Sequence, residues 1–168
     1  MSYSVPSTLG LSGPILQDLD AVETSAKDTL GKEVVDTASG RKFKYVLVDA
    51  SAVASGAGKP AYYMVGTTAN EVTSDYSDAQ VDEHTGATFA GVFCDDITGG
   101  TAEYCWIEIP NGAITPDCYC AAEVGICDGL VCAHDSSFSV VTSFSDRVVA
   151  VAMEAASSNL ADIIMLGS

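Results

Sequence analysis

The sequence predicts an all-β protein, a small antiparallel β-barrel or sandwich preceded by an N-terminal arm. Apolar and β-branched residues form short runs from residue 41 to the C-terminal end. Turn residues separate these runs at intervals of roughly eight to twelve residues, which is typical of barrels and sandwiches. The 168 residues suffice for one core of ordinary size. We therefore expect an arm over residues 1–39 and one β-domain over residues 40–168.

The arm consists mainly of small and polar residues, and its first part is interrupted by Pro6, Gly10, Gly13 and Pro14. Apolar residues then recur at steps of three and four up to Gly31, a spacing that predicts a short amphipathic helix. Because a lone helix of this length is marginal in water, it must pack against the domain or against another chain. The stripe consists of Leu16, Leu19, Val22, Ala26 and Leu30.

Two strands are predicted directly after Gly40. Residues 41–49 alternate basic and aromatic side chains and then become fully apolar, and residues 61–65 form a second β-rich run that ends at Gly66. Residues 67–86 are polar and rich in turn-forming residues. We expect this last segment to be a surface excursion that contributes nothing to the core.

Residues 87–94 and 104–109 predict an antiparallel hairpin. If its strands pair immediately outside the intervening loop, Cys94 lies opposite Cys105, near enough for an optional disulfide. Beyond this hairpin, turn residues alternate with further short β-rich runs that complete the domain. These runs are residues 118–121, 130–133, 138–142, 148–153 and 163–166.

The second strand of the hairpin has two different faces. Alternation places Tyr104, Trp106 and Glu108 on one face, and the apolar residues Cys105, Ile107 and Ile109 on the other. The purely apolar face is the better core. Trp106 is then left to pack beneath a loop or in a subunit interface, and we favour an interface that includes Tyr104 and Trp106, since tryptophan is enriched there.

The net charge of −16 excludes some classes of partner. The negative electrostatic field of such a chain repels nucleic acid and anionic membrane surfaces. Residues 61–168 carry sixteen acidic side chains against Arg147 alone, whereas residues 1–60 carry six basic and seven acidic ones. No stretch is apolar enough for a membrane span or an export signal, so we expect a soluble protein.

The six cysteines lie between Cys94 and Cys132, in a spacing that matches neither paired zinc knuckles nor a C-x-x-C redox site. Disulfides are one interpretation, and reduced, half-buried cysteines that act as small hydrophobes are the favoured one. Cys118 and Cys120 share one strand face, and with Cys132 and His134 they would make a zinc site only in one particular strand register. We assign no metal ligand.

The sequence offers little for catalysis. Its two histidines are His84 and His134, and neither lies in a recognised catalytic motif. Cys132 shares a strand face with His134, but we strongly favour the interpretation of a half-buried cysteine beside a histidine at a strand end over that of a catalytic pair. Acidic pairs such as Asp95-Asp96 lack a calcium-loop pattern, and no nucleotide-binding motif occurs. We therefore expect a non-enzymatic protein without catalytic residues or a cofactor.

Several short motifs, in their order along residues 30–168, resemble the small β-barrel decoration or cement proteins of tailed-phage heads. The chain differs from that pattern in the polar segment 67–86, in its six cysteines, and in Pro116, which stands where the family usually has glycine. The matching pieces are Leu30-Gly31 with residues 39–46, residues 90–92, residues 104–109 with Gly112, residues 115–117, Asp128-Gly129, and the closing runs 147–155 and 162–166.

The resemblance implies a structural protein that is assembled in the host cytoplasm and binds the major capsid protein on the virion exterior as a homotrimer. The arm would clamp adjacent capsid subunits, and residues 1–29 should be removable without unfolding the β-domain. The alternative is a carbohydrate-binding or adhesin-like β-barrel, in which an aromatic residue stacks on a sugar. The expected capsid contacts in the arm are Val5, Leu9, Leu11, Ile15, Leu16 and Leu19.

Overall fold

A computed structural model describes residues 3–7, 10–64, 70–75, 89–133, 137–143 and 147–166. Strands make up 42% of the structure and helix 1%, which confirms the all-β prediction. The strands in chain order are β1 Glu33–Val35, β2 Lys42–Val48, β3 Pro60–Tyr63, β4 Glu71–Thr73, β5 Phe89–Phe93, β6 Glu103–Ile109, β7 Ile114–Tyr119, β8 Gly129–Cys132, β9 Phe138–Val140, β10 Ala150–Ala152 and β11 Leu160–Met165.

The first sheet is closed into a barrel. Its strand order is β1-β2-β4-β3-β5-β6, and an additional pairing joins β2 to β6. Strands β2, β4, β3, β5 and β6 therefore form a ring, while β1 is attached to β2 outside it. The β2–β4 pairing is parallel and the other pairings of the ring are antiparallel. Closure protects the strand edges of this ring.

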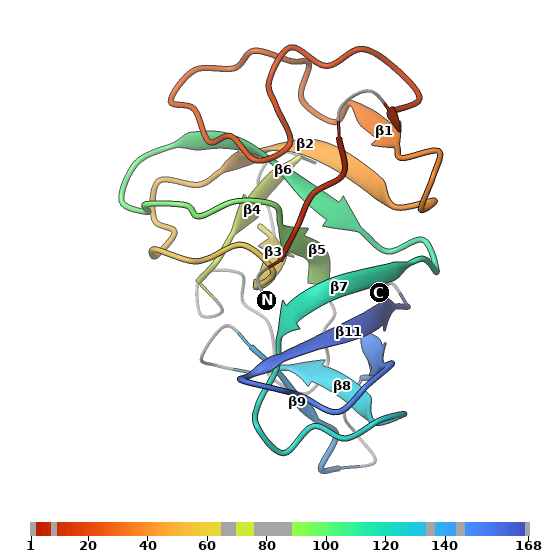
Figure 1. Cartoon of the computed structure of the whole chain (residues 1–168). Helices are drawn as coiled ribbons and strands as arrows, with labels where there is room; N and C mark the ends of the chain where they lie inside the picture. Colours follow the sequence, from red (N-terminus) through yellow and green to blue (C-terminus); the bar gives the residue numbers. More distant parts are fainter. Residues whose placement is uncertain are drawn as a thin grey trace.

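The second sheet has five strands in the order β7-β11-β10-β8-β9, and all of these pairings are antiparallel. A parallel bridge between Phe138 and Cys120 brings β9 back to the end of β7. Figure 1 shows this sheet at one end of the molecule, with the barrel next to it and residues 10–30 over the opposite end.

Three clusters of buried side chains correspond to these layers. The barrel interior contains Val46, Phe93 and Ile107. A second cluster fills the second sheet and receives Tyr62 and Phe89 from the barrel strands. We call the described residues before position 40 the N-terminal segment. The third cluster lies between the barrel and this segment, and it contains Leu19, Val34, Phe43, Tyr45, Cys94 and Trp106.

The hairpin of β5 and β6 forms, but its predicted register is wrong. Phe93 pairs with Ile107, and the Cys94 backbone N–H donates to the Trp106 carbonyl at 3.2 Å. Cys94 therefore lies opposite Trp106 and not opposite Cys105. This register places Phe93 beside Ile107 inside the barrel, and a shift of one residue would exchange the two faces of the strand.

Residues 11–30 form no helix, and the N-terminal segment does not stand apart as an arm. Strand β1 pairs with β2, and Leu19 is 1% exposed while Leu16 is 77% exposed. The Asp28 carboxylate accepts hydrogen bonds from the backbone N–H groups of Leu16 (2.7 Å) and Gln17 (3.0 Å). These donors are thus satisfied by a side chain rather than by a helical turn, so the expected stripe never forms.

The polar segment 67–86 also differs from its prediction. It contains β4, in which Val72 is fully buried in the barrel core. Three residues are too few to show a period, so the sequence carries no signal for this strand. Residues 65–69 and 76–88 lie outside the described residues.

Candidate functional site

Trp106, one of the two predicted interface residues, is fully buried within its own chain. Its indole N–H donates to the Gln17 carbonyl at 2.9 Å, and its ring lies 5.2 Å from the Tyr45 ring. The N-terminal segment thus covers Trp106, so the loop interpretation is right and the interface prediction is wrong. Complete burial equally prevents Trp106 from stacking on a sugar.

Tyr104, the other predicted interface residue, is partly buried. Its ring stacks on Tyr45 with centroids 6.4 Å apart, and its main chain pairs with Glu23 through bonds of 2.7 and 3.0 Å. Tyr104 therefore helps to hold the N-terminal segment on the barrel.

The predicted capsid contacts fall into four groups. Leu19 belongs to the core, so its assignment as a surface contact is wrong. Val5, Leu11 and Ile15 are partly buried against the third cluster, and Leu16 projects from the segment. Leu9 lies outside the described residues. Leu16 is thus the most exposed of the described candidates.

A buried ion pair joins the start of β2 to β6. The Arg41 guanidinium donates from Nη2 (2.6 Å) and Nε (3.0 Å) to Oε2 of Glu108. The Thr115 hydroxyl of β7 donates to the other Glu108 oxygen at 2.7 Å. The Glu108 carboxylate therefore forms hydrogen bonds with residues of both sheets, and it is not exposed to solvent.

The backbone of β6 also approaches β5 closely at this point. Residue 91 must be glycine, because a Cβ there would lie 2.0 Å from the Glu108 carbonyl oxygen.

Tyr3 extends this network to the N-terminal end of the described chain. Its hydroxyl donates to Glu108 at 2.9 Å, and Arg41 donates to the Ser4 carbonyl at 2.8 Å. Burial weakens the charged form of Arg41, but its bonds to Glu108 and the negative charge outweigh this effect and raise its pKa. The network ties residues 3 and 4 to the seam between the sheets, and its geometry is that of a structural ion pair.

The cysteines do not form a metal centre among the described residues. All six are free, and five are buried while Cys127 is exposed. Burial raises the pKa of Cys132 to about 12 and that of Cys120 to about 12, so both are thiols at neutral pH. No group of three or more Cys, His, Asp or Glu side chains could hold a metal ion there, and His84 and His134 lie outside the described residues.

Thiol labelling should therefore distinguish one cysteine from the rest. In the native protein we expect a reagent to modify Cys127 rapidly, whereas the five buried thiols react only after denaturation. Mass mapping of the labelled peptides checks this result. Rapid native labelling of Cys120 or Cys132 would contradict their burial, and fewer than six reactive thiols after denaturation without reductant would indicate a disulfide.

An apolar row crosses the outer face of the second sheet. Ile114 of β7 pairs with Ile164 of β11, Ile164 pairs with Val151 of β10, and Val151 pairs with Gly129 of β8. Directly paired residues project to the same face, and the neighbours of Ile164 along β11 point into the core. Val141 continues the row, since its side chain lies 3.6 Å from the position of a Cβ at Gly129.

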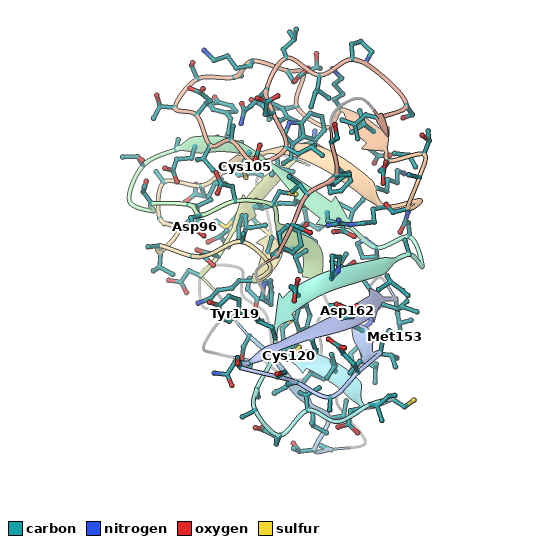
Figure 2. The ribbon with its side chains drawn as sticks, in the orientation of Figure 1. Asp96, Cys105, Tyr119, Cys120, Met153 and Asp162 are labelled. Carbon is teal, nitrogen blue, oxygen red and sulfur yellow. The ribbon has the colours of Figure 1, made fainter. Side chains whose placement is uncertain are left out.

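We call this row, together with the exposed residues Leu166 and Met153, the outer apolar band. Asp162 borders the band beside Met153, whose backbone N–H donates to the Asp162 carbonyl at 2.8 Å (Figure 2). The band itself contains no charged side chain, although the chain carries a net charge of −16. An uncharged apolar band on an acidic surface is typical of a protein interface.

No protein-family model and no curated protein matches this chain. Among the described residues, no helix is long and apolar enough to cross a membrane.

Proposed function

We propose that this protein is a non-enzymatic capsid decoration protein, which binds the outer surface of a tailed-phage head as a homotrimer and clamps adjacent subunits of the major capsid protein. The observation that carries this proposal is the outer apolar band. Copies of a strongly acidic chain repel one another at most of their surface, but they can meet at an uncharged face. The motif resemblance supports the same function.

The two ends of the molecule suit an oriented attachment. Residues 10–30 cover the end of the barrel opposite the second sheet (Figure 1). Residues 10–30 carry four acidic side chains against Lys27 alone, so charge does not mark this end as the attachment surface. We place the N-terminal segment against the capsid because Leu16 is 77% exposed there, and the second sheet then lies outward.

Trimer formation would strengthen attachment without a large contact in each chain. Because the three copies are linked, binding of one copy at a local threefold site raises the effective concentration of the other two there. Modest contacts in each chain then add up to strong attachment. The surface that contacts the capsid is then the packed N-terminal segment, and not a free arm. We place assembly in the host cytoplasm, where free cysteines stay reduced, and the bound protein on the exterior of the virion.

The trimer is tested by placing a charge in the band. Ile114→Lys should convert the trimer to monomers, because a buried lysine without a partner is costly at an interface. The matched control is Val53→Lys, since Val53 and Ile114 are both 48% exposed and the charge change is the same. Light scattering measures the mass. A monomeric wild-type protein, or a trimeric Ile114→Lys variant, would contradict the proposed contact.

Capsid attachment is tested by sedimentation with undecorated shells of the major capsid protein from the same source. The wild-type protein should sediment with the shells, and Leu16→Ala should weaken attachment about tenfold or more, the effect of a contact worth about 1.4 kcal/mol. Unchanged trimer mass shows that the variant is otherwise intact. A wild-type protein that stays in the supernatant would overturn the proposed function.

A further inference from the structure

A groove runs along the seam between the barrel and the second sheet. It consists of two adjoining cavities of about 330 and 410 Å³, and Lys59 and Tyr119 line both of them. The larger cavity is also lined by Ser55 and Asp96, and the smaller one by Asn159. Figure 2 shows Tyr119 between Asp96 and Cys120 along one side of the molecule. We call this the seam groove.

The fold holds the aromatic ring at the centre of the groove. Tyr119 ends β7, and its backbone N–H donates to the Gly58 carbonyl at 3.1 Å. The Lys59 ammonium lies 4.9 Å from the centroid of the Tyr119 ring, which leaves the residue 40% exposed. The ring is therefore anchored at its backbone and remains accessible to a ligand.

The larger cavity also contains polar groups that could form hydrogen bonds with a ligand. Ser55 is buried, and its hydroxyl has no partner among the described residues. Its main chain is fixed by two hydrogen bonds with Ile97, of 3.1 and 2.9 Å. The Asp96 carboxylate accepts the Ala57 N–H at 2.9 Å through one oxygen. A buried hydroxyl without a partner is unfavourable, so a ligand that bonds to Ser55 would gain affinity.

These features favour one class of ligand. Lys59 brings one positive charge into the groove, but Asp96 offsets it within the larger cavity and the net charge of −16 repels anions from the molecule. The polar lining disfavours a purely apolar molecule. A sugar combines an apolar ring face with hydroxyl groups. We infer that the seam groove binds a neutral saccharide, which stacks on the exposed part of the Tyr119 ring and hydrogen-bonds to Ser55 and Asp96. This site is independent of the capsid contact and differs from the buried Trp106.

The test uses backbone amide NMR spectra of the intact protein, recorded with glucose, galactose, mannose, N-acetylglucosamine or N-acetylgalactosamine at millimolar concentrations. At least one sugar should shift the signals of Ala57, Tyr119 and Cys120 in a saturable manner. Inorganic phosphate serves as the anionic probe. The absence of shifts with all five sugars, or shifts with phosphate alone, would overturn the proposal.

Three variants separate binding from folding. Tyr119→Ala should abolish the shifts, and Tyr119→Phe should retain them because it keeps the ring. Ser55→Ala should lower affinity about five- to tenfold and leave the melting temperature unchanged or higher, since its hydroxyl has no partner to lose. A Ser55→Ala variant that binds the sugar as tightly as the wild type would refute the role of Ser55. Capsid sedimentation of the same variants should stay normal, so failure here is distinguishable from failure of the proposed function.

Discussion

Replacement of Arg41 by methionine is expected to lower the free energy of unfolding by about 3–5 kcal/mol, the usual cost of breaking a buried ion pair. The substitution leaves the Glu108 carboxylate without its cation in a site that has no solvent exposure. It also removes the hydrogen bond from Arg41 to the Ser4 carbonyl, so the N-terminal end of the described chain loses an attachment. Both effects destabilise the folded state.

Chemical denaturation monitored by circular dichroism measures this loss. The matched control is Lys42→Met, because Lys42 pairs with Glu33 at 2.6 Å but the two side chains are 34% and 41% exposed. An exposed pair of this kind contributes about 0.2–1 kcal/mol. If Arg41→Met costs no more than Lys42→Met, the network around Glu108 does not hold the sheets together.

Deletion of residues 1–29 is expected to leave the chain largely unfolded, in contrast to the prediction from sequence. The deletion removes Leu19 from the core and uncovers Trp106 and Tyr45. It also removes Gln17, whose carbonyl accepts the indole N–H and whose side chain accepts the Tyr45 hydroxyl at 2.6 Å. These losses sum to at least about 5 kcal/mol, which is comparable to the whole stability of a typical domain.

Fluorescence gives a direct measurement, because Trp106 is the single tryptophan of the chain. Its emission should move to longer wavelength in the truncated protein, with loss of a cooperative unfolding transition. Two point variants locate the effect: Leu19→Ala should cost about 2–5 kcal/mol, and Leu16→Ala should stay within about 0.5 kcal/mol. A truncated protein with buried tryptophan and unchanged cooperativity would show that residues 1–29 are dispensable for folding.

The all-β class and most strand positions could be predicted from the sequence, because alternation and turn residues act over a few neighbouring residues. The run 104–109 illustrates this: its two faces separate as predicted, with Cys105 and Ile107 inside the barrel and Trp106 outside it. The N-terminal segment shows the opposite case. Its leucine spacing suggests a helix, but contacts with Asp28 and with the barrel determine an irregular path of bends and turns instead.

Local sequence patterns were therefore sufficient for the all-β class, for most strands other than β1 and β4 and for their apolar faces, and the composition showed the excess of acidic residues. The tertiary structure decided which segment covers Trp106, that Cys94 lies opposite that residue, and that one row of apolar residues stays outside. It also assembled the seam groove from Ser55, Asp96 and Tyr119, which are far apart in the chain. The reason is physical: register and layer packing depend on contacts between distant segments, and local periodicity carries no information about those contacts.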